Sequence, residues 1–117
     1  METKQVITAL SALAQESRLA VFRLLVQAGP EGMAASRISE QIGVAPSSLS
    51  FHLKDMSYAG LISSRQEGRF IIYSANFATM NGLIAFLTEN CCGGNLCGPA
   101  CAPACEPSQA KSKGVPA

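Results

Sequence analysis

The sequence predicts a mainly helical domain with one β-hairpin, followed by a cysteine-rich tail. Apolar residues recur at helical spacing through most of residues 1–90, two β-rich runs flank Glu67-Gly68, and all five cysteines lie beyond Asn90. We therefore expect one folded domain over residues 1–90. Residues 91–117 are rich in Gly, Pro and Ala, so they bury too little apolar surface to offset the entropy of ordering, and we expect a flexible tail.

Two amphipathic helices are predicted first. The apolar face of the first consists of Val6, Leu10, Leu13 and Ala14, at spacing i, i+4, i+7 and i+8. The second helix opens near Ser17 and stops at Gly29-Pro30. Its apolar positions are Leu19, Phe22, Leu25 and Val26.

Two further helices follow a loop over residues 29–32. The shorter one carries Ala35, Ile38 and Ile42 on one face and ends at Gly43. The next begins at Pro46, because the fixed φ and missing N–H of proline suit the first helical position. Its inward stripe is Leu49, Leu53 and Met56, and it ends at Ala59-Gly60.

A hairpin and a last helix complete the domain. Residues 61–66 and 69–74 form the two strands around Glu67-Gly68, and Asn76 is a good N-cap for the last helix. One side of that helix carries Phe77, Met80, Leu83, Ile84 and Leu87. The order helix, helix, helix–tight turn–helix, hairpin, helix is the layout of a winged helix-turn-helix.

This layout predicts binding to double-stranded DNA, because the helix after the tight turn presents its outer face to a major groove. With Leu49 facing the core, the outer face and its flanks carry serines, a phenylalanine and a lysine that suit base edges and phosphates, and each strand adds an arginine for phosphate contacts. The predicted DNA-binding residues are Ser47, Ser48, Ser50, Phe51, Lys54, Arg65 and Arg69. The alternative is a helix pair with a merely solvated polar face, and the net charge of +1 does not decide between them.

The remaining composition narrows the class of protein. His52, the only histidine, projects near the inward flank of its helix, so we expect a hydrogen-bonded packing residue. We expect a cytoplasmic protein with no membrane contact, since no signal peptide or long apolar run is visible. In that compartment clustered cysteines indicate metal binding or redox chemistry. No enzyme is expected, because the thiols have no positioned base.

The residues of three segments closely resemble the ArsR family of metal-responsive repressors. These segments are Ala12–Leu19 (A-L-A-Q-E-S-R-L), Pro46–Lys54 (P-S-S-L-S-F-H-L-K) and Ala59–Ile62 (A-G-L-I), and the resemblance extends to Asn90. It implies a homodimer that binds a palindromic operator and releases it when an inducer binds. It also implies dimerisation through the first and last helices, here through Val6, Leu10, Leu13, Met80, Leu83, Ile84 and Leu87.

Two inducer sites known in the resembled family are missing here. Ala34-Ala35-Ser36 stand where the best-known arsenic-sensing pattern has cysteines. The zinc sensors of the family use Asp and His on the last helix, and neither occurs between Phe77 and Asn90. An inducer must therefore bind elsewhere.

The tail supplies the candidate sensor, in the pattern C-C-x4-C-x3-C-x3-C. Soft thiolates select soft ions, and arsenite or antimonite favours three sulfurs because a lone pair fills the fourth direction. By similarity to family members with a vicinal pair and a third cysteine after the last helix, we expect Cys91, Cys92 and Cys97 to bind As(III) or Sb(III), without an organic cofactor. Cys101 and Cys105 are secondary candidates.

Other uses of the thiols stay open at this point. A protein of this fold could sense cadmium, lead or zinc, although a structural zinc site usually shows paired C-x2-C knuckles, or its exposed thiols could act as a redox switch. A thiol-rich metal-storage protein that never binds DNA is a further alternative. Such a protein has no need of the basic residues beside a groove-fitting helix.

Overall fold

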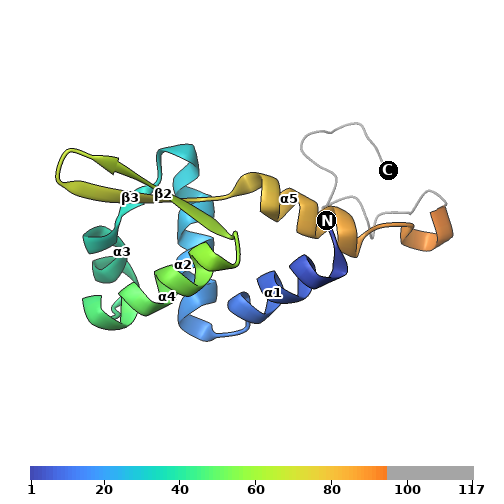
Figure 1. Cartoon of the computed structure of the whole chain (residues 1–117), viewed down its shortest axis with the longest axis horizontal. Coiled ribbons are helices and arrows are strands. Elements are labelled where there is room, and N and C mark those ends of the chain that lie inside the picture. Colours follow the sequence, from blue (N-terminus) through green and yellow to red (C-terminus); the bar gives the residue numbers. More distant parts are fainter. Residues whose placement is uncertain (95–117) are drawn as a thin grey trace. The chain divides into compact units, whose positions relative to one another are not determined.

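The computed structural model describes residues 1–94 (Figure 1). The tail beyond them, with Cys97, Cys101 and Cys105 and its predicted flexibility, lies outside the described residues. The elements are α1 (Thr3–Leu13), α2 (Glu16–Ala28), the 3-10 turn η1 (Gly29–Glu31), β1 (Met33–Ala34), α3 (Ala35–Ile42), α4 (Pro46–Tyr58), β2 (Ile62–Glu67), β3 (Phe70–Ala75), α5 (Phe77–Leu87) and the 3-10 turn η2 (Cys91–Gly94). Met1–Phe86 form one compact unit, and the chain from Leu87 onward is a separate unit.

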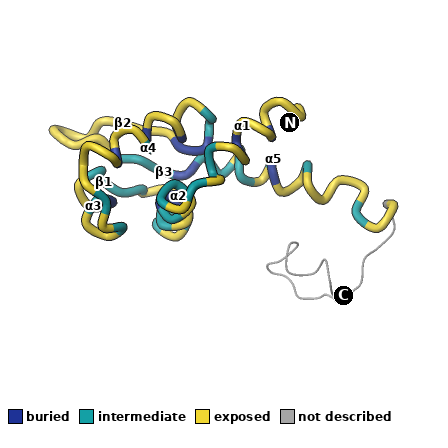
Figure 2. Tube along the Cα trace, turned by 90° about the horizontal axis from the view of Figure 1, so that it is seen from below, coloured by how far each residue is buried: buried dark blue, intermediate teal, exposed yellow. Residues whose placement is uncertain are grey.

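The core of the first unit lies where α2, α3, α4 and the sheet meet (Figure 2). Burial of these side chains is the main stabilising contribution to such a domain. The predicted stripe of α4 is confirmed, since Leu49, Leu53 and Met56 are all buried. The buried cluster consists of Ala9, Val21, Phe22, Leu25, Ile38, Leu49, Leu53, Met56, Leu61, Ile62 and Ala75.

The predicted faces of the first two helices are partly wrong. In α1 the buried residues are Val6 and Ala9, whereas Leu10 is 41% exposed. In α2 the buried residues include Val21, and Leu19 is 45% exposed. The spacing of large apolar residues does not identify these faces, because α1 buries a small residue, Ala9, and leaves Leu10 at its surface.

The sheet has three antiparallel strands in the order β1-β3-β2, and the prediction lacked β1. The hairpin turn is Gly68-Arg69, one residue beyond the predicted Glu67-Gly68, because Glu67 pairs with Phe70. Arg69 therefore lies in the turn and not in a strand. We call β2, β3 and this turn the wing.

The last helix begins as predicted. The side-chain Oδ1 of Asn76 accepts a hydrogen bond from the backbone N–H of Thr79 at 3.2 Å, which caps α5. Leu83 is its buried residue, while Phe77 and Met80 pack partly buried against the core. Over the described residues, no helix combines the length and apolar character needed to cross a membrane.

Candidate DNA-binding surface and thiol turn

A tight turn joins α3 to α4 and sets the direction of α4. Gly43 ends α3 with φ +78° and ψ 30°, a left-handed conformation that glycine adopts without steric cost. The Ser39 hydroxyl donates to the backbone carbonyl of Val44 at 2.5 Å, which fixes the chain after the turn. The helix α4 then begins at Pro46, which lies in its first turn. The α3–turn–α4 arrangement is a helix-turn-helix, and α4 is its second helix.

The outer face of α4 is exposed as predicted. Its five predicted DNA-binding residues, Ser47, Ser48, Ser50, Phe51 and Lys54, are all exposed, and Phe51 is exposed to 71%. Ser50 differs from the other serines, because its hydroxyl donates to the Pro46 carbonyl at 3.0 Å. In this conformation the Ser50 oxygen serves as an acceptor, which suits a base amino group better than a phosphate.

His52 is partly buried on α4, but the predicted hydrogen bond is absent. Among the described residues, its Nδ1 is the one buried side-chain nitrogen or oxygen without a hydrogen-bond partner. The packing role is therefore confirmed and the hydrogen bond is wrong.

A salt bridge on the flank of α4 was missed by the sequence analysis. Arg18 Nη1 of α2 lies 3.6 Å from Asp55 Oδ2 of α4, and the Arg18 Nε also donates to the Ala12 carbonyl at the end of α1. Arg18 is 19% exposed and Asp55 63%, so the pair contributes little to stability. It does place a positive charge beside the one acid of the α4 face, which lowers repulsion between that face and phosphates.

The wing places its two arginines differently. Arg69 lies exposed in the turn at the tip. Arg65 lies in β2, and its guanidinium bonds Glu67 and two backbone carbonyls of η1. Arg69 is thus exposed where a phosphate could contact it, as predicted. The guanidinium of Arg65 is instead bonded within the chain.

The seven predicted dimerisation residues divide into two groups. Val6 and Leu83 are buried within the chain, and Leu13 and Met80 are half-buried against the core. The exposed members are Leu10, Ile84 and Leu87, and Ile7, which the sequence analysis did not select, is 58% exposed. The exposed apolar surface of α1 is therefore centred on Ile7 and Leu10.

The two described cysteines lie in η2, which follows α5 in the sequence. Their Sγ atoms are 3.8 Å apart, well beyond the S–S bond length of about 2.05 Å. Cys92 has φ 57° and ψ 34°, a left-handed conformation that is uncommon for a non-glycine residue. Within residues 1–94 no group of three or more His, Cys, Asp or Glu side chains is placed to hold a metal ion.

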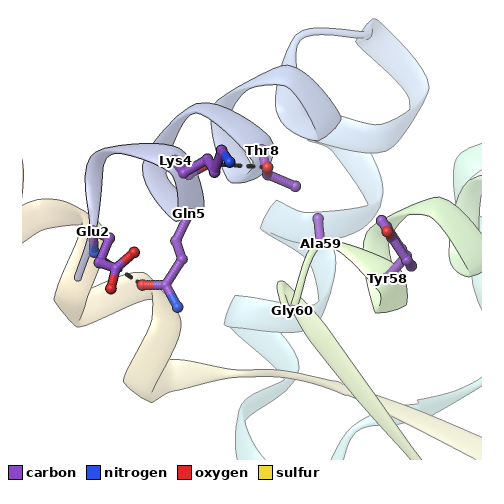
Figure 3. Close-up of a pocket in the computed structure, with 7 residues that line it drawn as sticks. All are labelled: Glu2, Lys4, Gln5, Thr8, Tyr58, Ala59 and Gly60. Carbon is purple, nitrogen blue, oxygen red and sulfur yellow. Dashed lines mark hydrogen bonds between the residues drawn. The ribbon is translucent and has the colours of Figure 1, made fainter.

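A shallow cleft of about 330 Å³ lies between the start of α1 and the end of α4 (Figure 3). Its lining residues are Glu2, Lys4, Gln5, Thr8, Tyr58, Ala59 and Gly60. None of the residues predicted to bind DNA or metal lines it. The cleft does not coincide with either predicted site.

Comparison with known proteins decides the class. Residues 13–65, from the end of α1 through the turn to β2, match the family model of a helix-turn-helix domain. The HTH-type transcriptional regulator YgaV of Escherichia coli K12 is 30% identical over 89 residues, which cover 76% of this chain and 88% of YgaV. The chain belongs to the helix-turn-helix (HTH-type) transcriptional regulators.

Solved structures agree with this family. An ArsR-like transcriptional regulator from Rhodococcus sp. RHA1 superposes with a TM-score of 0.66 at 25% identity, over 78% of this chain and 82% of the other. A homodimeric winged helix-turn-helix DNA-binding domain from Mycobacterium bovis gives a TM-score of 0.59 at 24% identity, over 79% and 85% of the two chains. The winged fold predicted from the sequence is confirmed.

For a DNA-binding regulator of this family, Lys54 gives a specific prediction. Replacing Lys54 with Gln removes an exposed charge from the outer face of α4 and should weaken DNA binding for all sequences alike. If Lys54 neutralises one phosphate, the slope of log affinity against log salt concentration should become shallower by about 0.9. Lys4→Gln, on the cleft between α1 and α4, is the control for a general decrease in positive charge. Equal slopes of log affinity against log salt concentration for the two variants would contradict a phosphate contact by Lys54.

Proposed function

We propose that this regulator is a homodimeric repressor that binds operator DNA and releases it when arsenite or antimonite binds thiolates at the end of α5. The observation that carries the proposal is the vicinal pair Cys91-Cys92 in η2, four residues after the last residue of α5. Cys97 would supply the third sulfur. The residues proposed to read and hold the operator are those of the outer face of α4 together with Arg69.

The distance between the two sulfurs fits a shared soft ion. Two thiolates that bind one zinc ion at about 2.3 Å in a tetrahedral shell lie about 3.8 Å apart, so this separation fits coordination of one ion without selecting between zinc and arsenite. The Sγ atoms of Cys91 and Cys92 are 3.8 Å apart. The pair therefore needs little rearrangement to supply two ligands.

The backbone of η2 also supports a functional turn. Cys92 holds a left-handed conformation, which costs a non-glycine residue about 1–3 kcal/mol. The turn is held by hydrogen bonds from Cys91 N–H to the Thr88 carbonyl and from Gly93 N–H to the Asn90 carbonyl, both of 2.9 Å. Such local strain is common at ligand sites, because it presents side chains in an arrangement that an unstrained turn would not give.

The choice of trivalent arsenic or antimony rests on the ligand set. The sequence offers three thiolates within seven residues, without the paired C-x2-C knuckles of structural zinc sites. A three-sulfur shell suits an ion with a lone pair in the fourth direction. Zinc, cadmium and lead are the competing ions, and oxidation of the vicinal thiols is the competing signal.

The homodimer rests on apolar surface that the single chain leaves exposed. Ile7 and Leu10 of α1 and Ile84 of α5 are each more than 40% exposed. Homodimer interfaces are more apolar than ordinary protein surface. A homodimer would also carry two α4 helices, one for each half-site of a palindromic operator. The similar Mycobacterium bovis domain is homodimeric, which favours the same assembly here.

The mechanism that we propose is a shift between two dimer arrangements. An ion that ties Cys97 back to Cys91 and Cys92 would restrain the residues that directly follow α5. If that restraint favours a dimer in which the two α4 helices are wrongly spaced, DNA affinity falls by the coupling free energy, typically about 1–3 kcal/mol. No chemistry beyond thiolate coordination is needed.

A fluorescence-anisotropy titration tests the proposal. The reduced full chain is titrated onto its own upstream promoter DNA, alone and with arsenite, antimonite, cadmium or zinc. We expect tight binding that arsenite and antimonite reverse and zinc does not. Binding that no ion reverses would contradict the sensor, and reversal by oxidant alone would make the thiols a redox switch. Absence of binding at low salt, where phosphate contacts are strongest, would contradict the repressor itself.

A further inference from the structure

The guanidinium of Arg65 in β2 makes three bonds within the chain. Its Nε donates to Glu67 Oε2 at 2.7 Å, its Nη2 to the Glu31 carbonyl at 2.6 Å, and its Nη1 to the Pro30 carbonyl at 3.4 Å. Every nitrogen of the group is thus engaged. These bonds use three of the five N–H donors and fix the orientation of the group, so a phosphate contact by Arg65 would be confined to the two remaining donors.

The bonds from Arg65 to η1 span the sheet. Arg65 pairs with Ile72 of β3, and Ile72 pairs with Ala34 of β1. Because β1 and β2 lie on opposite sides of β3, an arginine of β2 that bonds the turn leading into β1 crosses the central strand. The side chain therefore joins the wing to the segment from which α3 starts.

The segment at the far end of this link is itself firmly placed. Gly32, between η1 and β1, has φ +72°, and a Cβ on it would clash with the Tyr73 carbonyl oxygen. Only glycine permits so close an approach of η1 to β3. The carbonyls that Arg65 bonds are therefore held in a fixed position relative to the sheet.

The outer end of the wing, two of the six β2–β3 pairs, is not flanked by β1. The pairs Gln66–Ile71 and Glu67–Phe70 lie beyond the last pair made by β1. A two-stranded ribbon is marginally stable in water, and here Phe70 is 61% exposed and Ile71 42%. The direction of the wing tip is therefore set by the interactions that hold the part of the wing next to β1, among them the bonds from Arg65 to η1.

We propose that Arg65 is a positioning residue for DNA binding, which fastens the wing to η1 and so sets where Arg69 meets the DNA, without neutralising a phosphate itself. The inference rests on the DNA-binding part of the proposed function. It replaces the direct phosphate contact that the sequence predicted for Arg65.

Three variants of the full chain separate positioning from direct contact: Arg65→Lys, Arg65→Ala and Arg69→Ala, with the double variants. Lysine keeps the charge but lacks the planar fork that bonds carboxylate and carbonyls together. We expect Arg65→Lys and Arg65→Ala to weaken operator binding equally, by about tenfold. In the Arg69→Ala background the same changes should have almost no further effect, because Arg65 acts through the wing tip.

The opposite pattern would overturn the inference. If Arg65 contacts a phosphate, Arg65→Lys should bind like the parent protein, and the losses from Arg65→Ala and Arg69→Ala should add. Arg65 variants that bind as tightly as the parent would also contradict a positioning role.

Amide hydrogen exchange tests the same link without DNA. In Arg65→Lys, the backbone amides of residues 65–72 should exchange several-fold faster, while the buried amide of Leu25 in α2 should be unchanged. Equal slowing or acceleration at both places would indicate a general stability effect and overturn the inference. Faster exchange in the wing of a protein that fails to bind any promoter DNA would refute the proposed function and leave the Arg65 link intact.

Discussion

Replacing Cys91 or Cys92 with serine is expected to abolish release by arsenite while operator binding stays unchanged. A hydroxyl is a hard, protonated donor and does not replace a thiolate around a soft ion. In the parent protein, saturating arsenite should lower operator affinity by about 5- to 150-fold, the usual range of coupling between two sites. In either serine variant this factor should fall to about one.

Fluorescence anisotropy of labelled operator, at fixed salt and with reductant, measures both quantities. Cys105→Ser is the matched control, since it removes one thiol of the same tail and leaves the proposed ligands in place. It should respond to arsenite like the parent protein. A full arsenite response in Cys91→Ser, Cys92→Ser and Cys97→Ser alike would refute the site.

Replacing Gly32 with alanine is expected to destabilise the domain more than any other glycine substitution in the folded part. The new Cβ would clash with the backbone oxygen of Tyr73 and lie 3.0 Å from Cγ2 of Ile72, and the φ of +72° is itself strained for alanine. The free energy of unfolding should fall by at least about 2 kcal/mol. For a domain of this size that lowers Tm by about 8–16 °C.

Gly68→Ala separates the clash from the strain in φ. Gly68 has φ +62°, but nothing lies within 4 Å of a Cβ added there. Its substitution should cost about 1–2 kcal/mol, which is the strain of the left-handed conformation alone. Thermal denaturation followed by circular dichroism compares the two variants. A smaller loss in Gly32→Ala than in Gly68→Ala would show that η1 does not pack against β3 as described.

The elements with strong periodic signals were predictable from the sequence. The stripe of Leu49, Leu53 and Met56 defines the inner face of α4, and Pro46 and Gly43 mark the turn before it. Asn76 marks the start of α5. In these segments local preference and tertiary packing favour the same structure, so sequence reasoning succeeds.

The features that depend on distant residues were not predictable. The strand β1 has two residues, too few for an alternating pattern, and it exists because β3 supplies its partners. The wing turn lies one residue beyond the predicted position. The pairing of Glu67 with Phe70 leaves Gly68 and Arg69 as its two central residues. The hydrogen bond from Arg65 to Glu31 spans 34 residues, a separation at which the sequence carries no signal.

The candidate site divides in the same way. The exposed face of α4 follows from helical geometry once Leu49 is placed inside. The sensor prediction rests on cysteine spacing, and the described residues supply Cys91 and Cys92 at 3.8 Å. Cys97 lies outside the described residues, and the ligand roles of Cys91, Cys92 and Cys97 all stay predictions.

The central claim, that thiol coordination and operator binding are coupled, is tested most directly by measuring arsenite affinity with and without operator. Equilibrium linkage requires reciprocity. If arsenite lowers the operator affinity by a given factor, bound operator must lower the arsenite affinity by the same factor. Isothermal titration of arsenite into the reduced full chain, alone and saturated with operator, should give dissociation constants that differ by that same factor. Equal arsenite affinities in the two titrations would contradict the coupling, even if arsenite binds tightly to the tail.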